Sequence, residues 1–178
     1  MLITEKKNKN IFDIVIYGSI AKGKETPNDI DIVVVFLSGS LRQRMDRLQE
    51  IKQKARKFDK LDMKQILLHE LFSAAFMART GILEEGISVF QNRKFSETLG
   101  FRSYTLFSYS LKGLSHSEKV RFNYLLAGRT VKGIINQLKG ERIVNGAVKI
   151  PVENTLVFED ILKRYRISYN IKSILEEI

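Results

Sequence analysis

The chain has 178 residues with a net charge of +10, and it contains no cysteine. Hydrophobic residues make up 44% of it, which is enough to bury a core and excludes a disordered chain. The absence of cysteine excludes a disulfide framework and a thiolate metal site. No apolar segment has the length of a signal peptide's apolar region or of a membrane span, so we expect a cytoplasmic protein that does not bind a membrane.

The basic charge is unevenly distributed along the chain. Residues 1–100 hold 17 Lys and Arg and 13 Asp and Glu, a balance of +4, whereas residues 101–178 hold 13 and 7, a balance of +6. A basic surface concentrates anions, and nucleotides and nucleic acids are the common examples. The alternative is a solvated, lysine-rich surface of the kind found in many proteins from hot environments. The larger excess in the shorter segment favours residues 101–178 as the part that contacts a polyanion, if one binds.

The first hundred residues alternate strand and helix patterns, which predicts a mixed α/β sheet with two or three helices on one face. Gly18 ends the first strand, and a short helix is expected to begin in residues 19–23. The apolar positions of residues 41–58 recur at spacings of three and four, which indicates an amphipathic helix. The expected strands are 11–17, 29–36 and 61–67, and the further expected helices are 70–79 and 82–91.

Residues 101–178 predict a second, smaller α/β unit, so we expect domains at 1–100 and 101–178. Residues 101–111 have no strong period and read as a long helix or a link. Ser115 and Glu118 have capping-box spacing before a helix that Gly128 ends. Asn145-Gly146 between two β-rich runs predicts a hairpin. The further expected elements are helices 131–138 and 154–164 and a final strand around 167–171.

Two carboxylates open the second expected strand and follow a Gly18-Ser19 turn by ten residues. Asp29 and Asp31 should lie on one face of the strand, ~7 Å apart, because successive side chains alternate between faces. The alternative is a strand-ending turn followed by polar caps. Two unpaired carboxylates at the start of a buried strand would repel each other without a cation. The pattern therefore favours a site for divalent cations and a phosphate chain.

Nucleotidyl transfer needs this combination of groups. Two divalent ions can clamp the attacking and leaving oxygens of an in-line displacement, and Mg²⁺ prefers carboxylate, water and phosphate oxygens. A third carboxylate on a neighbouring strand would complete the metal site and accept the proton of the attacking hydroxyl. Asp62 lies inside the third expected strand and is our candidate for it, while Asp59 at the strand entry competes. The alternative for Asp62 is a salt-bridge or edge-strand residue, since Lys60 and Lys64 flank it.

The Gly18-Ser19 turn has the features of a phosphate-binding turn. A glycine lets the backbone approach a triphosphate, and a helix start supplies N–H donors. The Ser19 hydroxyl adds a donor, and Lys22 is close enough in sequence to face the phosphates. Gly23-Lys24 is not a P-loop, because Glu25 follows it and the earlier glycine is missing.

These motifs resemble the nucleotidyltransferase fold of the DNA polymerase β superfamily, and their spacing is similar to that of minimal nucleotidyltransferases. The resemblance covers about residues 10–92. The carboxylate of Asp62 on a later strand and the Glu85-Gly86 segment support it. Ile20, where many members have arginine, and Asn28, where many have serine, depart from the pattern. Neither departure removes a metal ligand, but Ile20 removes one phosphate contact.

The resemblance implies an enzyme that transfers a nucleoside monophosphate from an NTP, with ATP as the expected nucleotide, to an acceptor hydroxyl. It implies two Mg²⁺ ions, replaceable by Mn²⁺. The metal ligands would be Asp29, Asp31 and Asp62, and the nucleotide would be held by Gly18, Ser19 and Lys22. Acceptors in the family include RNA, DNA, small molecules and proteins, and minimal members often pair with a HEPN-type protein as antitoxins.

Three functions stay open from the sequence. One is transfer to RNA or DNA held by the basic residues 101–178, and another is antitoxin-type modification of a HEPN-type partner. The third is a catalytically silent nucleic-acid-binding module, which the intact Asp29, Asp31 and Ser19 disfavour. The tyrosines of residues 101–178 could stack on bases, but their helical spacing favours core packing.

Overall fold

The structure is a computed structural model that describes residues 2–21, 29–56, 58, 60–129 and 131–178. The chain divides into two compact units, Met1–Phe101 with Ile178, and Arg102–Glu177. Among the described residues, no helix combines the length and the apolar character that a membrane crossing requires.

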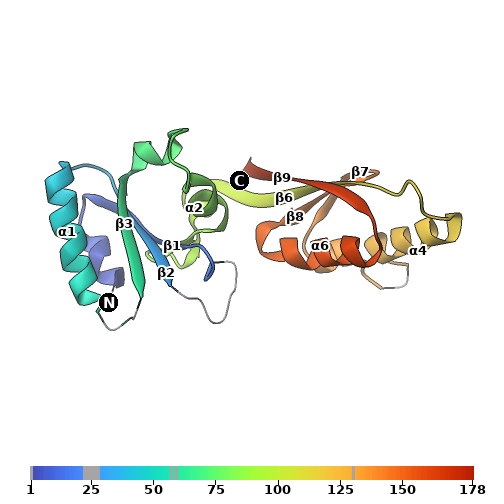
Figure 1. Ribbon diagram of the computed structural model, residues 1–178, viewed down its shortest axis with the longest axis horizontal. Coiled ribbons are helices and arrows are strands. Elements are labelled where there is room, and N and C mark those ends of the chain that lie inside the picture. Colours follow the sequence, from blue (N-terminus) through green and yellow to red (C-terminus); the bar gives the residue numbers. More distant parts are fainter. Residues whose placement is uncertain (1, 22–28, 57, 59, 130) are drawn as a thin grey trace. The chain divides into compact units, whose positions relative to one another are not determined.

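The first unit is built on a five-stranded mixed sheet in the order β3-β2-β1-β4-β5. Figure 1 labels its strands β3, β2 and β1. Only β2 and β3 run parallel; the other neighbours are antiparallel. Its strands are β1 (Ile11–Tyr17), β2 (Ile30–Phe36), β3 (Leu61–Leu67), β4 (Ile87–Ser88) and β5 (Arg93–Lys94). Its helices are η1 (Leu2–Lys7), α1 (Leu41–Lys54), η2 (Leu68–Phe72), α2 (Arg79–Glu85) and α3 (Phe95–Thr98), where η denotes a 3₁₀ helix.

The two faces of β2 enter two separate cores. Ile32 and Val34 pack with Leu48 and Ile51 of α1, whereas the alternate residues of β2 pack with Leu71, Ile82 and Phe95 of η2, α2 and α3. The mixed α/β class is confirmed, but the prediction that the helices of this unit all lie on one face of its sheet is wrong. A strand that is apolar on both faces must be covered on both, and helices supply the cover on each side.

Several predicted elements differ in extent. The helix predicted over residues 41–58 begins with a capping box of Ser40 and Gln43, as its pattern requires, but ends at Lys54. Residues 18–21 form a turn, and the rest of the helix predicted there lies outside the described residues. The helices predicted over residues 70–79 and 82–91 are wrong in extent: the structure has the short 3₁₀ helix η2, which ends at Phe72, and the helix α2, which runs through Gly81 and ends at Glu85.

Gly86 explains why α2 stops and a strand follows. A Cβ on Gly86 would lie 2.2 Å from the Ile82 carbonyl oxygen and 2.7 Å from a Val15 methyl carbon, so this position accepts only glycine. The close approach brings β4 against β1, where Ser88 lies opposite Val15. Residues 82–91, predicted as helix, therefore divide between α2 and the sheet.

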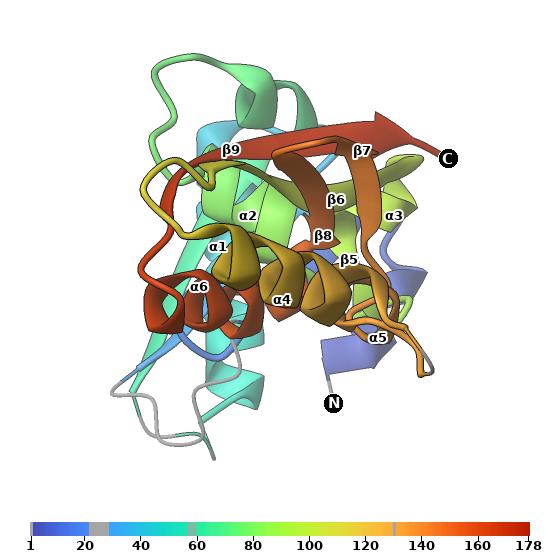
Figure 2. The same ribbon diagram turned by 90° about the vertical axis from the view of Figure 1, so that its right-hand side faces the viewer.

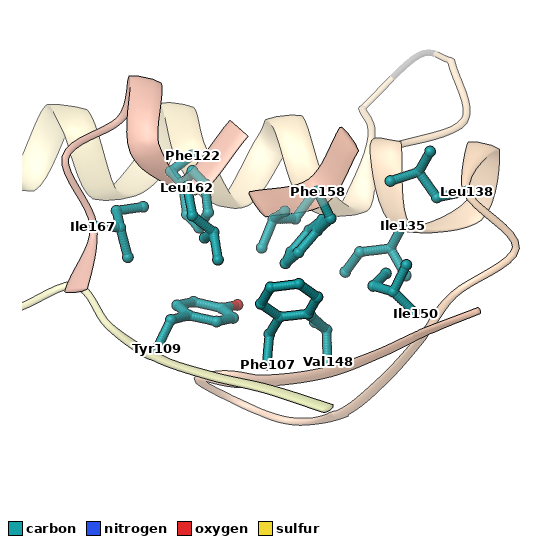
Figure 3. Packing of buried hydrophobic residues seen from close by; sticks show 11 residues of the cluster. Phe107, Tyr109, Phe122, Ile135, Leu138, Val148, Ile150, Phe158, Leu162 and Ile167 are labelled. Atoms are coloured by element: carbon teal, nitrogen blue, oxygen red, sulfur yellow. The ribbon is translucent and has the colours of Figure 1, made fainter. Parts of the chain in front are cut away.

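The second unit is a four-stranded sheet in the order β7-β8-β6-β9, with its helices on one side (Figure 2). Its core contains Phe107 of β6, Phe122 of α4 and Phe158 of α6 (Figure 3). The strands are β6 (Phe101–Ser110), β7 (Glu141–Val144), β8 (Ala147–Pro151) and β9 (Ser168–Glu177). The helices are α4 (His116–Ala127), α5 (Ile134–Gln137), η3 (Val152–Asn154) and α6 (Thr155–Arg164).

The local signals of the second unit are confirmed where they are strongest. Ser115 and Glu118 form the capping box of α4, Gly128 ends it with φ +80°, and Asn145-Gly146 joins β7 to β8. Residues 101–111, read as a helix or a link, form strand β6 instead. Its residues alternate between a buried and a more exposed face, the period of two that identifies a half-buried strand. The helix predicted over 131–138 shortens to α5.

Candidate active site

Three neighbouring strands bring Tyr17, Asp31 and Asp62 into one row across the sheet. Asp31 on β2 lies opposite Tyr17 on β1 and opposite Asp62 on β3. Adjacent strands lie about 4.8 Å apart, so these side chains are direct neighbours. Asp29 stands two residues before Asp31, exposed at the entry to β2. The strand pairing (Figure 1) thus brings together two carboxylates from segments 31 residues apart, with a third carboxylate beside them.

The carboxylates of this row influence one another. Burial raises the pKa of Asp31, and the negative charges of Asp29 and Asp62 raise it further, while Lys64 partly opposes them. A carboxyl with a raised pKa beside two like charges is a place where a cation is stabilising. The donor set consists of the hard oxygen ligands that Mg²⁺ prefers.

Among the described residues, Lys64 is a cation in direct contact with the site. Its Nζ lies 2.9 Å from Oδ2 of Asp62, and both side chains are about half exposed. The hydrogen bond to Asp62 is the main cause of the raised pKa of Lys64. Lys64 also lies near the Tyr17 hydroxyl, whose pKa is raised by burial and by Asp31 and Asp62 and lowered by Lys64. The positive charge of Lys64 therefore lies beside the negative charges of the site.

Gly18 brings the backbone directly against Asp31. It has φ +76°, and a Cβ built on it would lie 2.3 Å from Oδ2 of Asp31. Both the left-handed backbone and the lack of space require glycine here. Ser19 follows in the same turn and is half-buried. Lys22, predicted to face phosphates, lies outside the described residues, as do Asn28 and the competing Asp59.

The carboxylates of Asp29, Asp31 and Asp62 do not surround a common point in the structure. In the ranges that the structure describes, no group of three or more His, Asp or Glu side chains is close enough together to hold a metal ion. Asp62 is instead paired with Lys64. The residues that fit a divalent cation by their chemistry are Asp29, Asp31 and Asp62.

A further buried carboxylate, Asp13, has a structural role. Its Oδ2 accepts a hydrogen bond from the Ser88 hydroxyl at 2.5 Å, and its Oδ1 accepts one from the Ile14 N–H at 2.7 Å. Burial raises the pKa of Asp13, although the bonds from Ser88 and from the Phe90 N–H oppose this. These contacts fasten β4 to β1 and lie apart from the row of Asp31 and Asp62.

Residues 3–94 match the family model described as "Polymerase beta, Nucleotidyltransferase". The matched range holds Gly18 and all three candidate carboxylates and covers more than half of the chain. The chain belongs to this family. No match was found among curated proteins or among solved structures.

Membership of the nucleotidyltransferase family supports a nucleotidyltransferase-type activity in general. It extends over the first unit only, since the match ends at residue 94. One residue of the site, Tyr17, was missed in the sequence. The flanking Lys64 is a salt-bridge partner that the alternative interpretation of Asp62 names, and the structure contains that ion pair. Tyr17 is the last residue of β1, and only the pairing of β1 with β2 brings it opposite Asp31.

Proposed function

We propose that the protein transfers a nucleoside monophosphate from an NTP, with ATP as the expected substrate, to an acceptor hydroxyl and releases pyrophosphate. The observation that carries this is the row in which Asp31 and Asp62 lie side by side with the Gly18 backbone against Asp31, in a chain of the nucleotidyltransferase family. Asp29, Asp31 and Asp62 would hold Mg²⁺ or Mn²⁺, which when bound neutralises the charge that develops on the reacting phosphoryl group.

The residues of the row have separate roles in this proposal. The turn that begins with Gly18-Ser19 binds the triphosphate through backbone N–H groups and the Ser19 hydroxyl, and Lys22 contributes a positive charge. Asp62 accepts the proton of the acceptor hydroxyl, since it lies on the edge strand β3, where an acceptor can approach.

A labelling experiment tests the activity. The full chain is incubated with each α-labelled NTP and Mg²⁺ or Mn²⁺, together with RNA, DNA or cell lysate. We expect label to enter one class of acceptor and a chelator to abolish the transfer. Label in a single protein of the lysate would favour the antitoxin-type alternative with a HEPN-type partner. A folded protein that binds nucleic acid and labels nothing would instead be a silent binding module.

We further propose that residues 101–178 hold a polyanionic acceptor, with RNA as the first candidate. This segment carries the +6 balance, and Arg121, Arg129 and Arg164 are exposed in the second unit. Tyr109 and Tyr165 are not placed to stack on bases, because they pack against Phe122 in the core, whereas Tyr124 is exposed. Phosphate contacts therefore carry the proposal.

Salt dependence tests this role. Each phosphate neutralised by lysine or arginine releases condensed cations, so log K should fall with log salt by about 0.7 per contact on a single strand. Changing Arg121, Arg129 and Arg164 to glutamine together should reduce the slope by about 2 and weaken RNA binding. NTP binding should be unchanged. If the binding of the wild-type chain to RNA and DNA shows no salt dependence, the proposed role is wrong. The positive charge of residues 101–178 is then only a solvated surface.

A further inference from the structure

A polar hollow of about 390 Å³ lies in the second unit, where the hairpin of β7 and β8 turns beside the end of β6 and α4. Its polar lining comes from four separate elements. β6 contributes Tyr109 and Ser110, α4 contributes Asn123, β7 contributes Arg142, and the hairpin turn contributes Asn145. All residues that line the hollow belong to the second unit, whereas Asp31 and Asp62 belong to the first.

Arg142 is held in this hollow by a neighbour. Its Nη2 donates a hydrogen bond to Oδ1 of Asn123 at 3.1 Å. The Asn123 amide is itself fixed, since its Nδ2 donates to the Lys119 carbonyl at 3.0 Å. Within the described part of the chain, Arg142 makes no ion pair with a carboxylate. A guanidinium oriented on one side and without an anionic partner is suited to bind an anion.

The Tyr109 hydroxyl is a second feature that points to a ligand. Tyr109 is only 8% exposed, and among the described residues its hydroxyl finds no hydrogen-bond partner of good geometry. Its ring packs in the core beside Phe107 (Figure 3). Burial raises the pKa of Tyr109, whereas the charge and a hydrogen bond of the Arg142 guanidinium and a backbone hydrogen bond of Gly146 oppose this rise, so both groups lie beside the hydroxyl oxygen. These neighbours are donors, and the buried hydroxyl proton is left without an acceptor of good geometry among the described residues, which is uncommon and destabilising.

A second hollow of about 500 Å³ adjoins the first. The two share Tyr109, Ser110 and Asn145, and the second continues to Tyr169 and Asn170 of β9. Amide and hydroxyl groups line both. The hollow that contains Arg142 could hold one phosphate, and the larger hollow beside it, which has no charged residue in its lining, could hold the adjoining nucleoside.

We propose that the hollow at Arg142 binds a phosphate group of a single-stranded nucleic acid, with the guanidinium as its charge partner and the Tyr109 hydroxyl as a hydrogen-bond donor. The inference rests on the proposed function, since it names the part of residues 101–178 that contacts the acceptor. A bound phosphate would give Arg142 the anion and Tyr109 the acceptor that they lack. The basic balance of this segment favours a polyanion over an isolated anion.

Two variants of the full chain test the proposal with a labelled single-stranded RNA and with inorganic phosphate as probes. Tyr109→Phe removes a buried hydroxyl whose proton lacks an acceptor of good geometry among the described residues of the free protein and gains one in the proposed complex. We expect this variant to have a higher Tm than the wild type without RNA and to bind RNA roughly three- to tenfold more weakly. A substitution that only disturbed the fold would lower the Tm, so a higher Tm together with weaker RNA binding indicates a role in binding.

Arg142→Met should weaken RNA binding roughly tenfold and reduce the salt slope by about 0.7, the value of one phosphate contact. The matched control is Arg166→Met, which removes the same charge from an exposed residue that does not line either hollow. Inorganic phosphate should raise the Tm of the wild type and of Arg166→Met more than that of Arg142→Met.

Three results would overturn the proposal. They are a lower Tm for Tyr109→Phe, RNA binding by Arg142→Met that equals that of Arg166→Met, and a phosphate-dependent Tm shift that RNA does not compete with. Nucleotidyl transfer is measured separately. If transfer to an acceptor persists while both variants bind RNA as the wild type does, only this inference fails.

Discussion

Asp31→Asn is expected to abolish nucleotidyl transfer while the fold is retained. Asp31 lies at the centre of the row, beside Asp62 and against Gly18, and the change removes one anionic ligand without changing the size of the side chain. Metal stabilisation of a phosphoryl transfer contributes several kcal/mol, so the rate should fall by about a thousandfold or more. Transfer of labelled nucleotide at saturating NTP measures the change, and wild-type activity in the variant would refute the assignment.

The same variant should be more stable than the wild type when no metal is present. The pKa of Asp31 is raised above its ordinary value of 3.8, so the folded protein binds the proton more tightly than the unfolded chain does. The stability of the wild type therefore falls as the pH rises from 3.8 through the raised pKa. Asparagine does not titrate. The Tm of the variant in chelator should exceed that of the wild type at pH 7, and the difference should shrink toward pH 3.

Asp62→Ala is the informative comparison for this prediction. It should slow transfer but preserve much of the NTP binding, because in the proposed mechanism Asp29 and Asp31 would still hold a metal ion that binds the nucleotide. Asp31→Asn should impair both. A reversal of this order, with Asp62→Ala losing nucleotide binding and Asp31→Asn keeping it, would show that the roles of the two strands are exchanged.

Gly18→Ala is the second change with a large expected effect. The new Cβ would lie 2.3 Å from Oδ2 of Asp31, so either the turn or the carboxylate must move. Displacement of a reacting group by about 1 Å can lower a rate about a hundredfold, and we expect a loss of at least that size. The backbone conformation at φ +76° adds a stability cost of about 1–2 kcal/mol for alanine. Transfer assays and denaturant unfolding measure the two effects.

Gly100→Ala is the matched control. Gly100 has φ +85°, but a Cβ added there meets nothing within 4 Å. Both variants should therefore lose similar stability from the backbone, while only Gly18→Ala loses activity. Equal activity in the two variants would show that the approach of Gly18 to Asp31 has no role in the reaction.

The sequence by itself determined the features that depend on neighbours along the chain. The period of two in residues 29–36 predicts that Asp29, Asp31, Val33 and Val35 share one face, and the packing of Val33 and Val35 in a different core from Ile32 and Val34 confirms the alternation within β2. The capping box at Ser115 and the hairpin at Asn145-Gly146 are equally local. Hydrogen bonds and side-chain alternation over a few residues fix such features, so spacing alone reveals them.

Only the tertiary structure decided what lies beside each strand. The parallel register of β2 and β3 brings Asp62 opposite Asp31, and the antiparallel register of β1 brings Tyr17 to the other side. Strand pairs of this kind depend on hydrophobic burial across both faces of the sheet, which no local spacing encodes. The same holds for the helices on both faces and for the Arg142 hollow, whose lining comes from separate elements. The local pattern therefore supplied the candidate ligands, and long-range packing supplied the site in which they meet.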